Sequence, residues 1–446
     1  MSATMVSDSG GTARAVREFD DCTLDYSPAE LLLRLHRRHG PVIRFGTGRN
    51  RTVYLLGPEA NQFIAANSQL FCWREAYEAL IPVDGPTSMI VSDGEDHRRR
   101  RTLVQPALHH RQIDNYLNIM TENADAVIQS WQAGRTVDVY QEFRSAIRRS
   151  TIQSLFGPRL AADADFFGEQ LQSLLDLIDR LPAMVTWQRR LRLPIWRRAV
   201  AARSRIDERI YAEIDRVRDV RAEEAGDGVL AALVHGRDAT GNALSDLEIR
   251  DQVVTLIAAG YETTSAALAW AVYALLSTPG TWDQAAAEVR AVLGDRPPGR
   301  TDLRQLVYLN GVVQETLRLY PPAVITARKV VQDFEFAGRQ VHRGTLLIAS
   351  PYVTHRLPEL WPDPLRFRPE RWDARRPDYR KPGPHEYLPF GAGPHRCIGA
   401  VMATTEMTVM LARMLARTSL RLPSQRIRPT SYAAMRPRRG LLVETA

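Results

Sequence analysis

The sequence has few cysteines and no apolar leader at its N-terminus. Among its 446 residues are three cysteines, Cys22, Cys72 and Cys397, which are too few for a disulfide framework and favour a reducing, cytoplasmic setting. Residues 1–20 contain no apolar run, so we expect neither a signal peptide nor a membrane anchor there. With 44% hydrophobic and 25% charged residues, the composition excludes a mostly disordered, collagen-like or simple repeat protein.

Lysine is almost absent, because only Lys329 and Lys381 occur in the chain. The 59 basic and 51 acidic residues leave a net charge of +8, which is carried almost entirely by arginine. A basic surface attracts nucleic acid, an anionic membrane or an acidic partner protein, although GC-rich coding alone also yields an arginine bias. Nucleic-acid binding would need aromatic residues interleaved on a basic face and a recognisable module, and we find neither, so no nucleic-acid partner is expected.

The spacing of apolar residues predicts a mainly helical chain. Helices are expected at residues 28–39, 245–276, 281–293, 302–319 and about 397–416. Strands are expected within residues 41–56, 324–331, 334–336 and 345–349. Residues 255–276 are apolar enough to be considered for a membrane span, but the charge of Glu262 near the middle favours a buried central helix. The Pro-rich residues 357–394 predict an irregular segment. We expect its aromatic side chains to pack against the rest of the protein.

A glycine-rich turn at residues 390–399, FGAGPHRCIG, carries Cys397 to the expected start of a helix. Backbone amides and the positive dipole end at a helix N-terminus stabilise a thiolate, and His395 and Arg396 add positive potential. The three glycines leave room for a flat, bulky group against the backbone. A lone cysteine is most often a small core residue, and the other two cysteines lack the spacing of a zinc site. The surrounding pattern is therefore what favours a functional role.

An acid and an alcohol stand together inside the apolar helix. Glu262 and Thr263 lie in residues 259–264, AGYETT. A charged side chain inside an apolar helix indicates either a catalytic or a structural role. The structural alternative is a helix kink with a hydrogen-bonded carboxylate, because a Thr hydroxyl can bond to the carbonyl four residues earlier.

Two ion-forming pairs are spaced to share a helix face. Glu315 and Arg318 are separated by three positions, which by default forms a surface ion pair. His97 and Arg101 are separated by four positions and flank three further arginines, a pattern that by itself is typical of a solvated basic face.

In this order and combination, the motifs resemble those of the cytochrome P450 superfamily, the haem-thiolate monooxygenases. Residues 390–399 match its haem-binding loop at each diagnostic position. The resemblance implies a mainly α fold: one triangular, helix-rich domain over residues 28–446 with small β-sheets, preceded by a flexible N-terminus at residues 1–27. Length alone would instead predict two or three domains of roughly 150 residues. Haem b would lie between the helix of Glu262 and the helix after Cys397.

The resemblance also implies roles for single residues. Cys397 would be the metal ligand, and Glu262 and Thr263 would be catalytic, delivering protons through ordered water. The residues placed around the haem are His97, Arg101, Ala259, Gly260, Arg328, Phe390, His395, Cys397 and Gly399. A structural triad that holds the cysteine loop would consist of Glu315, Arg318 and Arg371.

The implied reaction is that of a cytochrome P450 monooxygenase, an oxidoreductase that inserts one oxygen atom of O2 into a C–H bond or an alkene. Two electrons and two protons reduce the other atom to water. Residues 419–446 are too few for a flavin or iron–sulfur domain, so electrons from NAD(P)H are expected through an external ferredoxin or flavodoxin with its reductase. A haem-thiolate isomerase or dehydratase, and a non-catalytic haem-binding protein, are the alternatives.

The expected protein is a monomer that attracts such an acidic carrier through basic residues on the side of Cys397. Those residues are Arg98, Arg99, Arg100, His109, His110 and Arg111.

By position in the family, the substrate pocket should be formed by residues 76–90, 183–187 and those after Pro322. The pocket residues expected from these segments are Tyr77, Leu80, Ile81, Met89, Ile90 and Val324. They are mostly apolar, which favours a hydrophobic substrate of terpenoid, steroid, fatty acyl or polyketide type, as in secondary metabolism. Residues 189–198 form a second basic cluster, interleaved with apolar residues. A solvated helix rim is the favoured interpretation, and contact with lipid or an anionic substrate is the alternative.

Overall fold

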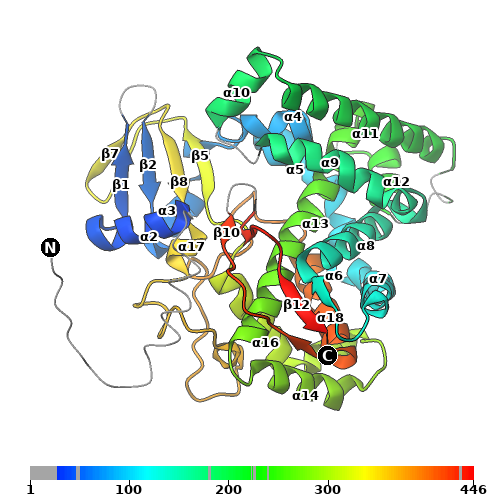
Figure 1. The fold of residues 1–446 in the computed structure, drawn as a ribbon. Coiled ribbons are helices and arrows are strands. Elements are labelled where there is room, and N and C mark those ends of the chain that lie inside the picture. The colour runs from blue at the N-terminus through cyan, green and yellow to red at the C-terminus, as the bar shows by residue number, and fades with distance from the viewer. Residues whose placement is uncertain are drawn as a thin grey trace.

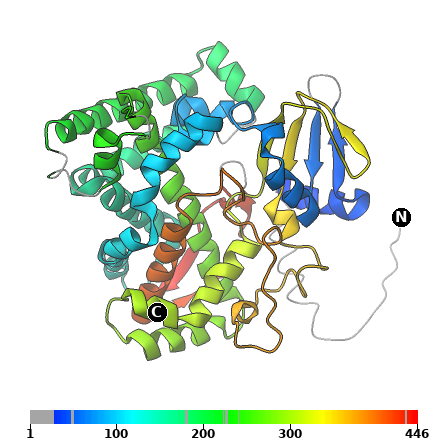
Figure 2. The same cartoon turned by 180° about the vertical axis from the view of Figure 1, so that it is seen from behind.

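The computed structural model describes residues 28–46, 51–178, 182–221, 224, 228–238, 241–430 and 434–445. The segment expected to be flexible, residues 1–27 with Cys22, lies outside them. A large helical body stands beside a smaller lobe built on a sheet (Figures 1 and 2). Within the described ranges, we find no helix with the length and apolar character needed to cross a bilayer.

Helices form most of the body. Its main helices are α5 (Gly94–Val104), α7 (Leu117–Ser130), α8 (Val139–Ala162), α9 (Ala164–Ile178), α10 (Pro182–Arg190), α11 (Pro194–Arg218), α12 (Val229–His235), α13 (Asp246–Ser277), α14 (Thr281–Leu293), α16 (Val307–Leu319) and α18 (Ala400–Arg417). The short helices are α4 (Ile81–Asp84), α6 (His110–Ile113), α15 (Arg300–Gln305) and α17 (Pro351–Thr354). Two helices, α2 (Pro28–His39) and α3 (Pro58–Ala66), belong to the sheet lobe.

The central helix is α13, which is buried over almost its whole length. Its sequence has no continuous polar stripe, so apolar side chains on all of its faces pack into one large core together with α8, α16 and α18. A capping box between Ser245 and Glu248 satisfies its first amides. α8 packs along it and is kinked at Gly157 (φ 85°), directly before Pro158.

The lobe contains a five-stranded sheet with the order β1-β2-β8-β5-β3. Its strands are β1 (Val42–Phe45), β2 (Thr52–Leu55), β3 (Phe71–Cys72), β5 (Thr326–Val330) and β8 (Leu346–Ala349). β2 and β8 are parallel, and the other pairs are antiparallel. β5 therefore brings the chain after residue 320 next to the segment that begins at β3. Smaller sheets pair β6 (Phe334–Phe336) with β7 (Arg339–Val341), join β4 (Thr136–Asp138), β12 (Leu442–Thr445) and β9 (Leu420–Arg421), and pair β10 (Pro429–Thr430) with β11 (Arg436–Pro437).

Two predicted helices have different bounds in the structure. The helix expected at residues 302–319 is two helices, because Leu306 is non-helical (φ −77°, ψ 65°) between α15 and α16. The Glu288 carboxylate of α14 accepts hydrogen bonds from the amides of Tyr308 and Leu309, both at 2.8 Å, and so caps the start of α16. The helix expected from Cys397 begins at Ala400, since the cysteine amide donates to the Phe390 carbonyl at 2.9 Å.

The Pro-rich segment is irregular apart from the 3-10 helix η7 (Pro369–Trp372), and it is packed as expected. Trp361, Trp372 and Tyr387 form a cluster with ring centroids 4.6–6.2 Å apart. Gly311 of α16 allows η7 to approach closely, because a Cβ at this position would lie 2.5 Å from the Pro369 carbonyl oxygen.

Candidate active site

A cavity of about 370 Å³ lies where α13, α8, α18 and the cysteine loop meet. Most of its lining is apolar. α13 contributes Thr255, Leu256, Ala259, Gly260 and Thr263 to one wall. The opposite wall is formed by residues 388–391, 395–399 and the first two turns of α18. The cavity thus lies between the two helices that the sequence predicts to flank the haem.

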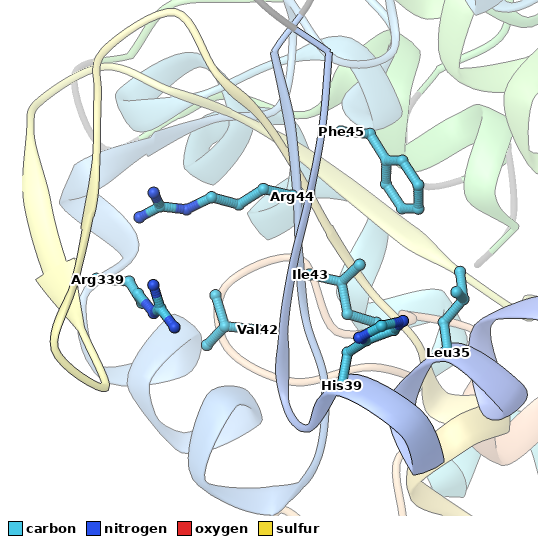
Figure 3. Close-up of a pocket in the computed structure, with 7 residues that line it drawn as sticks. All are labelled: Leu35, His39, Val42, Ile43, Arg44, Phe45 and Arg339. Carbon is cyan, nitrogen blue, oxygen red and sulfur yellow. The ribbon is translucent and has the colours of Figure 1, made fainter.

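A second hollow of about 380 Å³ lies at the outer edge of the sheet lobe. Figure 3 shows that its residues lie on two sides of strand β1: Val42, Arg44 and Arg339 on one side, and Ile43 and Phe45 on the other. Its polar groups do not converge on one point, as they would in a binding site. The cavity beside Cys397 is therefore the candidate site.

Cys397 sits in a loop with two left-handed glycines, Gly391 (φ 70°) and Gly393 (φ 73°). Its sulfur is open to the cavity, while protein atoms enclose the residue on the remaining sides. Burial raises the pKa of the thiol, and the Gly399 backbone N–H, Arg101 and Arg396 oppose this rise. The sequence predicts that the amides at a helix N-terminus stabilise the thiolate. Because Cys397 precedes α18 by three residues, only the amide of the N-cap residue Gly399 has this role in the structure.

Two partly buried cations lie at the same end of the cavity. Arg101 lines the cavity, and Arg328 lies over the ring of Trp73, which also lines it. Among the described residues no carboxylate lies within salt-bridge distance of either arginine. Burial lowers the pKa of both guanidinium groups. An unpaired, partly buried cation is costly, so this arrangement calls for an anionic ligand.

A stack of rings joins these cations to the cysteine loop. The His395 ring lies 4.3 Å from the Trp73 ring and 4.0 Å from the His97 ring, measured between centroids. The Tyr77 ring also stacks on Trp73, at 4.9 Å between centroids, and the Arg328 guanidinium lies 4.7 Å from the Trp73 centroid. Burial, and then the neighbouring His97, lowers the pKa of His395 to about 3, so this ring is neutral. Nothing in the sequence singled out Trp73, because its role depends on contacts across the fold.

The residues present fit a haem. A single open thiol could provide one iron ligand. His97 and Arg101 at the cavity edge, with Arg328 beside Trp73, could provide donors for two carboxylates. The described ranges hold no cluster of three metal-ligating side chains, so iron here would need ligands of a cofactor's own. The expected haem contacts Ala259, Gly260, Phe390 and Gly399 also line the cavity.

Glu262 and Thr263 point in different directions. The Glu262 carboxylate is buried against α8 and the C-terminal segment, where it accepts hydrogen bonds from the Tyr140 hydroxyl and Arg144 Nε, both at 2.7 Å. Arg436 Nε lies 3.3 Å from the same carboxylate. Thr263 lines the cavity, and its hydroxyl donates to the Ala259 carbonyl at 2.8 Å. The Glu262 carboxylate is thus held on the side of α13 that faces away from the cavity, whereas Thr263 lines the cavity.

Gly260 has a packing role that the sequence did not show. A Cβ at this position would lie 2.8 Å from the Thr151 Cγ2 atom of α8. The glycine therefore allows α8 and α13 to approach each other, in addition to lining the cavity.

The three residues expected to form a triad are brought together. Arg318 donates two hydrogen bonds of 2.8 Å to the Glu315 carboxylate, and Arg371 Nε lies 3.4 Å from the same group. The Trp372 indole and the Arg368 amide also donate to Glu315, at 2.9 Å and 3.0 Å. This network ties α16 to the Pro-rich segment that leads to the cysteine loop.

Of the six residues predicted to form the substrate pocket, three line the cavity and three do not. Tyr77, Met89 and Ile90 line the cavity. The residues that do not line it are Leu80, Ile81 and Val324. The Val324 side chain is buried in the core and its carbonyl accepts from Ser350, so its neighbours Ala323 and Ile325 line the cavity instead. Of residues 183–187, also expected at the lid, Met184, Val185 and Trp187 do not line the cavity, and α10, which contains them, lies at the outer edge of the helical body. The side chains of Ala183 and Thr186 lie outside the described part of the structure.

Three of the basic residues expected to receive an electron carrier are already paired. Arg98 forms an exposed ion pair with Glu95 within α5. Arg99 forms ion pairs with Asp238 (2.7 Å) and Glu248 (2.8 Å), and Arg100 Nη2 lies 3.1 Å from Glu248. These contacts arise because α5 packs beside the start of α13. Among the described residues, exposed basic side chains without an ion pair remain at His109, His110, Arg111 and Arg396.

Glu406 is a cavity residue that sequence reasoning missed. It lies on α18, is 1% exposed, and its Oε1 atom has no hydrogen-bond partner among the described residues. Burial raises the pKa of this carboxyl to about 8. The sequence signal is a lone glutamate on the apolar face of a helix.

Comparison with known proteins identifies the family. The family described as Cytochrome P450 matches residues 22–444. Cytochrome P450 139 from Mycobacterium tuberculosis (strain ATCC 25618 / H37Rv) is 57% identical over 422 residues, which cover 94% of this chain and 98% of the relative. Cyclooctat-9-en-7-ol 5-monooxygenase from Streptomyces melanosporofaciens is 34% identical over 385 residues, covering 86% and 83%. The structure of retinoic acid bound cyanobacterial CYP120A1 superposes with a TM-score of 0.83 at 25% identity and covers 93% of each chain.

Proposed function

Because the chain belongs to the cytochrome P450 family of monooxygenases, we propose that it oxygenates a hydrophobic small molecule of terpenoid type, by hydroxylation or epoxidation. The observation that carries this proposal is the apolar cavity, which has one open thiol at its base and the partly buried, unpaired cation Arg101 at its edge. Two similar proteins support the substrate class, since one is named for an unsaturated alcohol and the other is bound to retinoic acid.

When bound, haem b supplies the oxygen-activating chemistry. In our proposal, Cys397 provides the thiolate ligand, and Arg101, Arg328 and His97 hold the propionates through charge-assisted hydrogen bonds. His395 holds the loop through its stack with Trp73.

Glu262 and Thr263 serve proton delivery in this proposal. The Thr263 hydroxyl faces the cavity and can orient a water molecule there, whereas the Glu262 carboxylate faces the back of α13. Burial and the adjacent carboxylate raise the pKa of Tyr140, so its hydroxyl remains protonated and donates to Glu262. Glu262 must therefore exchange a contact to Tyr140 or Arg144 before it passes a proton toward Thr263.

Substrate selection rests on the apolar wall formed by Met89, Ile90, Leu155, Leu256 and Ile325. Such a wall binds by the apolar area that it removes from water, about 25 cal/mol per Å². Few polar groups converge there, so the site favours a largely hydrocarbon substrate.

The family depends on electron supply from redox partners. We propose a ferredoxin or flavodoxin with its NAD(P)H-dependent reductase in the cytoplasm, docking on a monomer at the exposed residues Arg98, His109, His110, Arg111 and Arg396. Acidic carriers are steered by such a surface, and the rate of reduction should fall as salt is added.

Two experiments test the proposal. The reduced protein treated with carbon monoxide should show a Soret band at about 450 nm, as thiolate ligation implies. The variant Cys397→Ser should lack this band. A screen of terpenes, steroids and fatty acids by spin-state shift, followed by product analysis with a surrogate ferredoxin pair, should yield an oxygenated terpenoid. Product formed without an electron donor would instead establish an isomerase or dehydratase, and no ligand response would leave only haem binding.

A further inference from the structure

One part of the cavity wall is held by side chains of α13. Residues 85–90, which we call the wall segment, end with Met89 and Ile90, and both of these line the cavity. Residues 85–88 belong to no helix or strand, and the 3-10 helix η4 (Met89–Val91) follows them. Because much of this backbone is buried, its amides and carbonyls need partners outside the segment.

Gln252 of α13 pairs with two backbone groups of the wall segment. Its side-chain oxygen accepts a hydrogen bond from the Met89 amide, and its side-chain amide donates to the Thr87 carbonyl, both at 2.9 Å. The side-chain amide also donates to the Glu248 carbonyl, one turn earlier in α13, at 3.0 Å. Gln252 is completely buried, and a hydrogen bond is stronger away from water. Its length therefore sets the separation between α13 and the backbone that carries Met89.

Asp251, the preceding residue, bonds to the same segment. Its Oδ2 atom accepts from the amide and the hydroxyl of Thr87, at 2.9 Å and 2.7 Å. Its Oδ1 atom accepts from Arg250 at 2.8 Å, and Arg250 also pairs with Asp207 of α11. Gly85 lies so close that a Cβ there would be 2.0 Å from this Oδ1 atom. The wall segment is thus packed directly onto a carboxylate that a second ion pair holds in place.

A third contact lies beside the cavity. The Thr255 hydroxyl donates to the Ser88 hydroxyl at 2.7 Å, and the Ser88 oxygen accepts from the Ile90 amide at 3.2 Å. Thr255 itself lines the cavity, whereas Asp251 and Gln252 are not among the described residues that line it. The wall is therefore positioned in part by side chains that a ligand in the cavity would not touch.

The chain on either side of the wall segment has anchors of its own. Arg203 of α11 donates to the carbonyls of Ile81 and Pro82 in α4, at 3.2 Å and 3.1 Å. At the other end, the Ser92 hydroxyl donates to the Ser88 carbonyl at 2.6 Å. Loss of a contact from α13 should therefore displace residues 85–90 and leave the helices on both sides in place.

We propose that Gln252 and Asp251 are positioning residues that determine which substrates fit, because they fix Met89 and Ile90 at one separation from α13. This inference rests on the proposed function, in which the apolar wall selects the substrate. A wall whose amides are already paired is preorganised, so a substrate that fits it loses little affinity in ordering it. Without these partners, the buried amides must bond elsewhere, and the wall moves away from a ligand of matching size.

The variant Gln252→Leu tests the inference in the haem-loaded protein with three azole probes of increasing size: imidazole, phenylimidazole and clotrimazole. Their absorption shifts give the dissociation constants. Imidazole is too small to reach the wall, so its constant should not change. The preference for clotrimazole over phenylimidazole should rise about fivefold, because the smaller probe loses roughly 40 Å² of apolar contact with the displaced wall. Amide hydrogen exchange of residues 87–90 should become about fivefold faster, the effect of one lost hydrogen bond.

The matched control is Asn61→Leu, which removes a buried amide of the same chemistry. Asn61 Nδ2 donates to Thr354 Oγ1 at 3.1 Å and to the His385 carbonyl at 3.0 Å, and none of these residues lines the cavity. This variant should be less stable, yet it should keep the probe preference and the exchange rates of the unchanged protein. The control separates a general loss of stability from a change in the wall.

Thr87→Val is a milder second variant, because it removes the hydroxyl bond to Asp251 and keeps the amide bond. It should shift the probe preference in the same direction as Gln252→Leu, but less. An unchanged preference in both variants would overturn the inference, and faster exchange with unchanged preference would reduce Gln252 to a structural residue. A protein that lacks the carbon monoxide band would contradict the proposed function instead. Hydrogen exchange would then still decide whether Gln252 and Asp251 hold the wall segment.

Discussion

The Glu315 carboxylate accepts two 2.8 Å hydrogen bonds from the Arg318 guanidinium, and both side chains are completely buried. Arg318 also donates to the carbonyls of His355 and Pro364, at 2.7 Å each. One ion pair therefore joins α16, α17 and the Pro-rich segment. The pair lies far from Cys397 in sequence, yet it holds the Pro-rich segment that precedes the cysteine loop.

We predict that Glu315→Gln lowers the free energy of unfolding by about 3–5 kcal/mol, because it leaves the Arg318 charge buried without its partner. Burial raises the pKa of Glu315, but Arg318 and the hydrogen bonds outweigh this and lower it below 4.5. Its contribution is thus complete above pH 4.5 and is lost as the pH falls through the lower folded value. Urea unfolding at several pH values measures both effects. Asp373→Asn, which breaks a surface pair with Arg375, should change the free energy of unfolding far less than Glu315→Gln does.

Gly260→Ala should destabilise the protein by about 1–3 kcal/mol, because the new Cβ would lie 2.8 Å from the Thr151 Cγ2 atom. Thr151→Ser removes that methyl group, so the double variant should regain much of the lost stability. Thermal unfolding of the two single variants and the double variant forms a mutant cycle. Strictly additive effects would show that the two side chains do not meet.

The pKa of Glu406, raised by burial to about 8, predicts an unusual pH dependence. The folded protein keeps this proton while the unfolded chain releases it near pH 4.5, so stability should decrease between pH 4.5 and 8. The expected slope from this one group is ~1.4 kcal/mol per pH unit. Glu406→Gln should remove that slope and be the more stable protein at pH 8. An unchanged slope would mean that Glu406 is ionised or is hydrogen-bonded in solution.

Thr263→Ala should increase the share of electrons that is lost as hydrogen peroxide relative to product, since the hydroxyl that faces the cavity would no longer orient water. The measurement compares NAD(P)H consumed, peroxide released and product formed. Ser265→Ala is the matched control: its hydroxyl bonds back along the same helix, is fully buried and does not line the cavity. Equal coupling in both variants would remove Thr263 from proton delivery.

Much of the fold follows from local sequence. The bounds of α2 and α14 agree with the predicted ones, and α13 is displaced by one residue. Apolar spacing and capping residues set these bounds, and both are properties of neighbouring residues. The break at Leu306 was missed because the cap of α16 comes from Glu288, on another helix.

The candidate site was predictable as a set of residues but not as an arrangement. The pattern around Cys397 identified the loop, and α13 was identified by the acid and alcohol inside an apolar run. Which face each side chain takes was not available, so Glu262 was expected beside the cavity although it is held by Tyr140 and Arg144.

By itself, the sequence determined the helical class, the cysteine loop and the family to which the chain belongs, because these depend on residue types at short spacing. Tertiary structure alone decided which charges are paired. Arg99 and Arg100 lie next to Arg101, yet Glu248 and Asp238 form ion pairs with those two while Arg101 faces the cavity. The reason is physical: an ion pair forms between residues that packing brings within about 4 Å, whatever their separation along the chain.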